Sequence, residues 1–240
     1  MRLPHWKSRQ RPNWPDYLED RAKRVRHPML KQFFHEMRLD PDRPIGETPM
    51  VGFDLETTGL DAGRHDIVSI GLVPFTLSRI PMKESRYWVV APRRQLSNES
   101  VTFHHITHSE IDGAPDLGDV LGEVLSVMKG RLPVVHYRHV ERPFLDGAIR
   151  ERLGEGAVFP LIDTMSLEAR RHRRRRWVWI RRLMGRPPAS IRLHESRLRY
   201  NLPAYQGHHA LTDALSTAEL LQAQVLTHYS PETPLKTLWS

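Results

Sequence analysis

The sequence predicts an α/β domain with a mixed central sheet flanked by helices, preceded by a helical N-terminal extension. Three apolar runs separated by turn residues come first, which is typical of a β-meander. Helical and strand patterns alternate after the meander. A strand that returns to the sheet through a helix pairs in parallel with its neighbour, so we expect the sheet to be mixed.

The N-terminal extension, residues 1–47, contains six prolines, five of which bracket a helical stretch. Asp16 is the expected helix cap, and Pro28 is expected to interrupt the helix. The apolar face consists of Leu18, Val25, Met29, Leu30, Phe33, Phe34 and Met37. We expect this face to dock either on the domain or on a protein partner.

The main domain, residues 48–228, should contain five strands. Apolar runs predict them at residues 49–54, 66–75, 87–91, 132–136 and 159–162. Turn residues at 59–63 and 77–83 separate the first three. Residues 229–240 are expected to form a C-terminal tail.

Helices should alternate with the later strands. Leu117, Leu121, Val124, Leu125 and Met128 follow helical spacing, and Gly130 should end that helix. Residues 139–153 predict a second helix with Phe144, Leu145 and Ile149 facing inward. Asp163 is placed to cap a third helix that begins at Thr164.

Charge is distributed unevenly along the chain, which carries a formal net charge of +8. Residues 1–44 hold 11 Lys and Arg against 6 Asp and Glu, and residues 170–199 hold 12 Arg against Glu195 alone. The remaining residues together carry −8. Basic appendages would draw a polyanion toward an acidic body; the alternative is that they only solubilise the protein.

The most biased region is RRHRRRRWVWIRR at residues 170–182, inside an Arg-rich helical segment at about 168–200. Arginine binds phosphates bidentately and aromatic rings stack on bases, so Arg173, Arg174, Arg175 and Arg176 are candidate contacts to a nucleic-acid backbone. Alternatively, these arginines form the solvated outer face of a helix whose inner face holds Trp177, Ile180, Leu183 and Met184.

Composition also excludes several classes of protein. The chain has no cysteine, so it has neither a disulfide framework nor a thiolate zinc site. The first residues lack an apolar signal region, and no stretch approaches the roughly 20 apolar residues that span a bilayer. We therefore expect a cytoplasmic protein without membrane contact.

Three separated segments carry the candidate chemistry: FDLETTGL with Asp54 and Glu56, HYRHVERPFL with Glu141, and GHHALTDA with His208 and Asp213. Asp54 and Glu56 follow a buried strand and share one side of it. Two buried carboxylates need a compensating cation, and oxygen ligands suit Mg²⁺ or Mn²⁺. We interpret the five residues as a phosphodiesterase site that binds two divalent cations.

A proton acceptor completes this interpretation. His208 lies five residues before Asp213, so it need not share the helical face of Asp213. A position in the loop before the helix would let the imidazole reach the site, and its ordinary pKa near 6.5 suits a general base. His209 is the adjacent competitor.

These three segments resemble the three motifs of the DEDDh 3'–5' exonuclease superfamily, the DnaQ-like proteins. Its members include proofreading subunits and domains of bacterial DNA polymerases, ribonuclease T and oligoribonuclease. The resemblance covers roughly residues 48–225 and leaves the N-terminal arm and the Arg-rich region outside. It implies a ribonuclease H-like fold and a metal-dependent 3'–5' exonuclease, with His208 as base and Asp54, Glu56, Glu141 and Asp213 as ligands.

The resemblance also implies a pocket for the terminal nucleotide, lined by Thr57, Thr58 and Leu60, partly through backbone N–H groups. Phe103 would stack on a base and His105 would close one side of the pocket; the alternatives are a core aromatic and a surface turn. Asp163 would orient the fold or cap a helix.

The second motif departs from the family pattern. Glu141 stands where the superfamily has aspartate, and Tyr137 stands where it usually has asparagine. The longer side chain of Glu141 would still reach a metal, or would displace the second ion by about 1 Å, a shift that costs on the order of 10²-fold in rate.

Three hypotheses follow. The first is an active exonuclease on 3' ends of single-stranded DNA, which we favour, or of RNA. The second is a catalytically weakened nucleic-acid-binding or polymerase-associated module, which the Glu141 departure supports. In the third, the acidic body cleaves dinucleotides and the basic arms serve oligomerisation.

Overall fold

The computed structural model describes residues 12–94, 108–172 and 189–240. Five strands form one sheet in the order β3-β2-β1-β4-β5. The strands are β1 (Met50–Thr57), β2 (Ile67–Phe75), β3 (Arg86–Val89), β4 (Leu132–Val135) and β5 (Ile162–Asp163). β1, β2 and β3 pair antiparallel, whereas β4 and β5 add to β1 in parallel. The predicted mixed sheet is confirmed.

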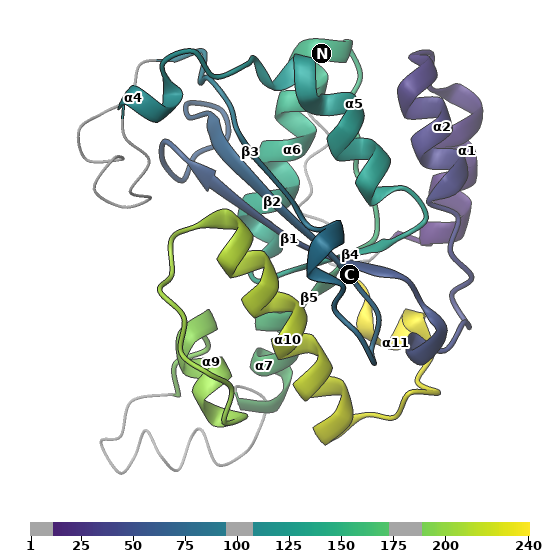
Figure 1. The fold of residues 1–240 in the computed structure, drawn as a ribbon. Coiled ribbons are helices and arrows are strands. Elements are labelled where there is room, and N and C mark those ends of the chain that lie inside the picture. Colours follow the sequence, from purple (N-terminus) through teal and green to yellow (C-terminus); the bar gives the residue numbers. More distant parts are fainter. Residues whose placement is uncertain (1–11, 95–107, 173–188) are drawn as a thin grey trace, which may run out of the picture.

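Helices cover both faces of the sheet (Figure 1). They are α1 (Trp14–Arg24), α2 (Pro28–Glu36), α4 (His108–Ile111), α5 (Leu117–Met128), α6 (Arg138–Leu153), α7 (Thr164–His172), α9 (Leu193–Arg199), α10 (Ala210–His228) and α11 (Leu235–Leu238), with short 3-10 helices η1 (Ile45–Glu47) and η2 (Met82–Glu84). The long helix α10 packs against β1 and β2, and α5 and α6 lie on the other face.

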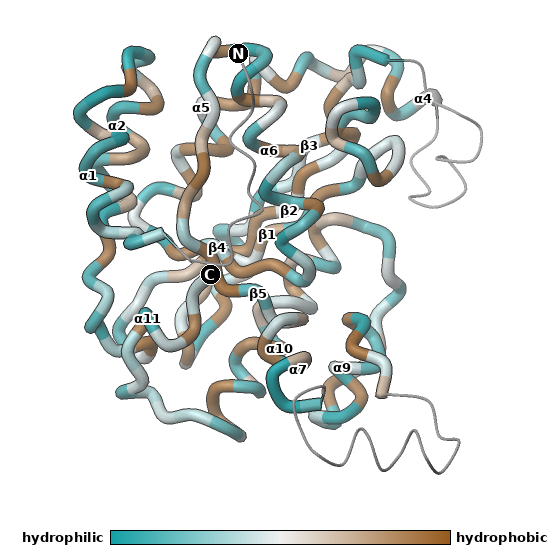
Figure 2. The backbone as a smooth tube through the Cα atoms, turned by 180° about the vertical axis from the view of Figure 1, so that it is seen from behind, coloured by the Kyte–Doolittle hydropathy of each residue, from teal (hydrophilic) through white to brown (hydrophobic). Residues whose placement is uncertain are grey.

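The alternating side chains of the strands build one core on each face. Val51, Phe53 and Leu55 of β1 belong to a core shared with α2, α5 and α6. Met50 belongs to a second core, to which α10 and α11 contribute Leu221 and Leu238. Apolar residues gather along the central strands, while α1 and α2 alternate between hydrophilic and hydrophobic residues (Figure 2).

The N-terminal extension forms two helices, α1 and α2, instead of one interrupted helix. Pro28 begins α2, where its missing N–H costs no helical hydrogen bond. Asp16 is not the cap: Asn13 occupies the N-cap position, and Asp16 in the first turn accepts a hydrogen bond from Asn13 Nδ2 at 2.5 Å. Phe33 is fully buried and contacts the ring of Phe159 at 5.5 Å. The extension therefore docks on the domain.

Strand ends differ from the prediction at two places that matter for the site. β1 continues to Thr57 because Asp54 and Glu56 remain paired with Gly71 and Ser69 of β2. β5 is shorter and later than the predicted run, since it pairs with β4 only at Ile162 and Asp163. The chain end also joins the body, where buried Trp239 forms a bridge with Ile162.

Within the residues that the structure describes, no helix combines the length and apolar character needed to cross a bilayer.

Candidate metal centre

The alternation of β1 points Asp54 and Glu56 to the face covered by α10. Their neighbour Phe53 faces the opposite core. Gly52 lies on the α10 side, because a Cβ atom there would lie 2.4 Å from the carbonyl oxygen of Ala214. Residues two apart on a strand share a face, so Asp54 and Glu56 follow Gly52 along this side.

Two glycines let α10 lie against the sheet at this point. A Cβ atom on Gly71 would lie 2.2 Å from the carbonyl oxygen of Ala210, in the first turn of α10. Gly71 and Gly52 are therefore sites where only a glycine permits the close approach of the helix backbone. This approach brings Asp213, also in the first turn of α10, down to β1.

Asp54, Glu56 and Asp213 form one carboxylate cluster, in which each offers an oxygen within 4.8 Å of the others. Burial, followed by the charges of Glu56, Asp213 and Glu141, raises the pKa of Asp54 well above its usual range. Burial and Asp213 raise the pKa of Glu56 to about 8. Three carboxylates held this close repel one another unless a cation lies between them, so the donor set fits a hard divalent ion.

Asp213 is held by the loop before it. The backbone N–H of His208 donates to Asp213 Oδ2 at 2.8 Å. Burial raises the pKa of Asp213, and this hydrogen bond and the adjacent histidines oppose the rise. The carboxylate therefore has one oxygen fixed by the backbone and remains in the cluster.

Glu141 lies in the first turn of α6, directly after β4, and is 4% exposed. Its charge raises the pKa of Asp54, but it is not part of the cluster of three. Burial raises the pKa of Glu141 itself well above its usual range, and Oε2 has no hydrogen-bond partner among the described residues. A buried carboxylate oxygen without a donor fits a ligand for a second cation.

The two histidines occupy different environments. His208 is exposed, with a φ of 68°, in the loop just before α10, as the sequence predicted. His209 takes the N-cap position, and its ring stacks on Tyr87 of β3 with 4.6 Å between centroids. The ring of His209 is held against β3 by this stacking. The ring of His208 makes no hydrogen bond to a described residue.

The predicted nucleotide contacts lie at the end of β1. Thr57 Oγ1 donates to the carbonyl of Gly59 at 2.7 Å, and Thr58 Oγ1 accepts from the N–H of Asp66 at 3.0 Å. Both hydroxyls therefore hold the turn in shape. Leu60 is 85% exposed, so its side chain is available to a ligand. Phe103, His105 and the arginines Arg173, Arg174, Arg175 and Arg176 lie outside the described residues.

Tyr137 links β4 to α6 in a conformation that L-residues rarely adopt, with φ 106° and ψ 72°. Its N–H donates to Asp163 Oδ1 at 3.2 Å. The same oxygen accepts from the N–H groups of Met165 and Ser166 in the first turn of α7. Asp163 thus caps α7, as predicted, and also ties the start of α6 to it.

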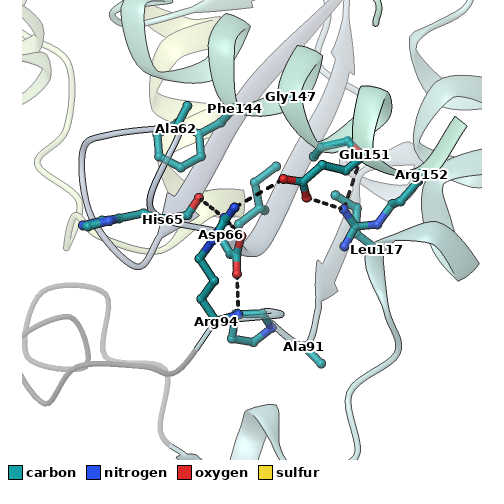
Figure 3. Close-up of a pocket in the computed structure, with 13 residues that line it drawn as sticks. Ala62, His65, Asp66, Ala91, Arg94, Leu117, Phe144, Gly147, Glu151 and Arg152 are labelled. Carbon is teal, nitrogen blue, oxygen red and sulfur yellow. Dashed lines mark hydrogen bonds and ion pairs between the residues drawn. The ribbon is translucent and has the colours of Figure 1, made fainter. Parts of the chain in front are cut away.

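A small cavity of about 20 Å³ is lined by the turn between β1 and β2 and by residues of α5 and α6 (Figure 3). Arg94 extends between two acids there, at 2.5 Å from Asp66 and 3.3 Å from Glu151. None of the three clustered carboxylates lines it. The cavity is too small for a nucleotide, and its ion pairs are structural.

Sequence reasoning did not find Gly52, Gly71 or Arg197, a buried residue of α9 near the His208 loop. Gly52 carried a signal, because a glycine inside an apolar strand and on the same face as Asp54 indicates close approach of another backbone. Arg197 carried none, since it is one of many arginines in residues 170–199.

A mixed sheet with acidic side chains at the end of its first strand and on the facing helix provides a carboxylate site that can bind a divalent cation. The model of the exonuclease family matches residues 51–221, and the chain belongs to that family. The predicted exonuclease family is thereby confirmed.

Curated relatives include PolC-type DNA polymerase III of two bacteria. The Thermotoga maritima protein is 29% identical over 129 residues, which are 54% of this chain and 9% of the relative. The Bacillus subtilis protein is 28% identical over 180 residues, which are 75% of this chain and 12% of the relative. The chain therefore spans only about a tenth of the length of these relatives.

Solved structures share the fold at low identity. The nuclease domain of 3'hExo bound to rAMP, a DEDDh family member, superposes with a TM-score of 0.59 at 15% identity, covering 75% of this chain and 92% of the other. Exonuclease X in complex with 5' overhanging duplex DNA gives 0.56 at 22% identity, covering 78% and 97%. These similarities confirm the ribonuclease H-like fold.

Proposed function

We propose that the chain removes nucleotides from the 3' end of single-stranded nucleic acid with two divalent cations, and that DNA is its preferred substrate over RNA. The convergence of Asp54, Glu56 and Asp213 within 4.8 Å is the observation that carries this proposal. The similarity to PolC-type DNA polymerases supports DNA as the substrate and a polymerase as a candidate protein partner.

The ligand assignment is part of the proposal, and the grouping of the carboxylates supports it. Asp54 and Asp213 would hold one cation, and Glu56 would bridge toward the base. The buried Oε2 of Glu141 would reach toward the other. Mg²⁺ or Mn²⁺ at such sites lowers the pKa of a bound water and neutralises charge on the phosphate.

His208 would take the proton of the attacking water. The water would attack phosphorus while the bond between phosphorus and the 3' oxygen of the preceding nucleotide breaks. A nucleoside 5'-monophosphate would leave, and the freed 3' oxygen would take up a proton from solvent. Exposure leaves the imidazole of His208 accessible to a water at the cluster, and the backbone N–H of His208 joins its loop to Asp213. His209 is the weaker candidate because its ring is stacked on Tyr87.

The terminal nucleotide would lie over the end of β1. Leu60 offers an exposed apolar surface beside a base, and the turn formed by Thr57 and Thr58 offers backbone groups. The arginines at 173–176 are the proposed contacts to phosphates further along the bound nucleic-acid strand. Phe103 and His105 are the remaining proposed residues of the nucleotide pocket.

The test uses single-stranded DNA and RNA labelled at either end, incubated with Mg²⁺, Mn²⁺ or EDTA. We expect metal-dependent release of mononucleotides from the 3' end, and its loss in Asp54→Ala. His208→Ala should lower kcat by about 10²-fold or more, as loss of a general base does, whereas the matched His209→Ala should change it far less.

The second motif is tested in the same assay. Glu141→Asp should retain metal-dependent turnover if the carboxylate is a ligand, since Asp keeps the charge and only shortens the reach. Binding of the oligonucleotide without turnover in any metal would overturn the enzyme proposal and favour a nucleic-acid-binding module. Recovery of turnover in Glu141→Asp from such an inactive protein would then assign the loss to residue 141.

A further inference from the structure

The loop that carries His208 joins α9 to α10 and holds two residues with a positive φ. Asn201, at its start, has a φ of 55°, and His208, near its end, has a φ of 68°. Side chains other than glycine adopt this conformation at a cost, and it persists only where neighbouring contacts impose it. The contacts of this loop therefore decide where the imidazole of His208 lies.

Few contacts fix the loop close to His208. The backbone N–H of His208 donates to Asp213, and its ring is exposed with no hydrogen bond to a described residue. The contacts that hold the loop in place lie earlier in it, at Leu202, Pro203 and Tyr205. All three of these residues contact Arg197.

The Arg197 side chain binds the loop and α10 at the same time. It is 3% exposed. One terminal nitrogen donates to the carbonyl of Ser216 in α10 at 2.7 Å, and the other donates to the carbonyl of Pro203 in the loop at 2.9 Å. Ser216 lies one helical turn after Asp213, so the guanidinium joins the loop to the helix segment that carries the metal ligand.

Tyr205 and Glu219 complete the connection. The guanidinium of Arg197 lies over the ring of Tyr205 at 4.6 Å from its centroid. Glu219 of α10 pairs with Arg197 at 2.7 Å and accepts a hydrogen bond from the Tyr205 hydroxyl at 3.0 Å. The backbone carbonyl of Arg197 also accepts the N–H of Leu202 at 3.2 Å. One residue thus contacts the loop through its backbone, its charge and its planar face.

We propose that Arg197 is a positioning residue that holds the 201–208 loop on α10 and so sets the place of the His208 imidazole relative to the carboxylate cluster. The proposal rests on the proposed function for its catalytic consequence. Lysine cannot replace arginine here, because an ammonium offers no planar fork for two carbonyls and no face for the tyrosine ring.

The first experiment is a double-mutant cycle with Arg197→Lys and His208→Ala in the full chain. Arg197→Lys should lower kcat by about 10- to 100-fold with little change in KM, because a shift of about 1 Å in a catalytic group costs on that order. In the His208→Ala background, the same substitution should lower kcat by less than about 3-fold, because the group that it positions is absent.

Arg199→Lys is the matched control. Arg199 lies on the same helix and pairs at 2.6 Å with the fully buried Glu168, away from the loop. Arg199→Lys should lower the Tm about as much as Arg197→Lys does, and it should leave kcat unchanged. Equal losses of kcat from Arg197→Lys with and without His208 would overturn the proposal, because they would show a role in general stability. Tyr205→Leu, at a partly exposed site, repeats the cycle if Arg197→Lys does not fold.

Amide hydrogen exchange tests the tether without any turnover. Peptides covering residues 201–208 should exchange faster in Arg197→Lys than in the wild type, and at the wild-type rate in Arg199→Lys. Unchanged exchange in Arg197→Lys would overturn the proposed tether. A wild type without nuclease activity would instead refute the proposed function and leave the exchange result to decide the tether.

Discussion

Asp54 lies directly opposite Gly71 in the antiparallel pair of β1 and β2. Because Gly71 has no side chain, the first turn of α10 can lie directly against the strand there. The carboxylate and the glycine therefore act together. Asp54 is the proposed metal ligand, and Gly71 lets α10 bring Asp213 close to it.

The first prediction concerns this close approach. Gly71→Ala and Gly52→Ala should each displace α10, because their new Cβ atoms would lie 2.2 Å and 2.4 Å from backbone oxygens. Overpacking of this kind costs roughly 1–3 kcal/mol. We expect a lower free energy of unfolding, and we expect Mn²⁺ to raise the Tm of the wild type but not that of these variants. Gly147→Ala is the control, since its Cβ meets no atom within 4 Å and should stabilise α6.

The second prediction concerns the repulsion within the cluster. At pH 8.5 in EDTA, Asp54→Asn should raise the free energy of unfolding by roughly 1 kcal/mol or more, because it removes a buried like charge. In saturating Mn²⁺ the order should reverse, since the wild type gains about 2.7 kcal/mol at 100 times Kd and the variant does not. Asp61→Asn, at an exposed turn residue, is the control. A wild type more stable than Asp54→Asn in EDTA would contradict this.

The third prediction concerns the strained residue Tyr137. Asparagine tolerates a positive φ better than tyrosine does, so Tyr137→Asn should stabilise the protein by roughly 1 kcal/mol. Tyr137→Phe retains the strain and should leave stability unchanged. Urea denaturation of both variants measures the difference, and equal stabilities would show that the backbone at 137 carries no strain.

The fourth prediction concerns pH. Burial lowers the pKa of His136 from 6.5 to about 4. Nε2 lies 3.0 Å from the carbonyl of Ile191 and so donates, while Nδ1 faces the Thr164 hydroxyl at 2.8 Å. Between these two pKa values the unfolded chain binds a proton that the folded chain does not, so stability falls as the pH falls from 6.5 to 4.

The loss from His136 should reach roughly 3 kcal/mol over this range, by the free energy of a pKa difference of that size. Urea unfolding at pH 7 and at pH 4.5 measures it, and His136→Gln should show a smaller loss between the two. An equal loss in the variant would place the effect on other groups.

Periodicity predicted the elements well where one face is buried. The apolar spacing of Leu121, Val124 and Leu125 predicted α5, and the same reasoning found the buried residues Phe144 and Leu145 of α6. The ends of β1 and β5 were harder, because polar residues such as Glu56 stay in a strand when a neighbour pairs with them. Pairing is a tertiary property that single-strand patterns do not contain.

The site, too, has features that a local sequence pattern predicts and features that depend on tertiary contacts. The same-side placement of Asp54 and Glu56 follows from the strand period, and the structure brings Asp213 to them. The separation of Glu141 from that cluster depends on how α6 leaves β4. The contacts of Arg197 join residues up to 22 positions apart through burial and ring geometry, for which the sequence offers no local pattern.

The side chains of β1 alternate between the two faces of the sheet, and this makes the enzyme sensitive to a shift in the register of the strand. A deletion of one residue between Met50 and Phe53 would turn every later side chain of the strand to the opposite face. Phe53 would then point at α10, and Asp54 would enter the apolar core that α5 and α6 build. The register of β1 thus determines both which side chains enter the core and which carboxylates face α10, so a change in one is also a change in the other.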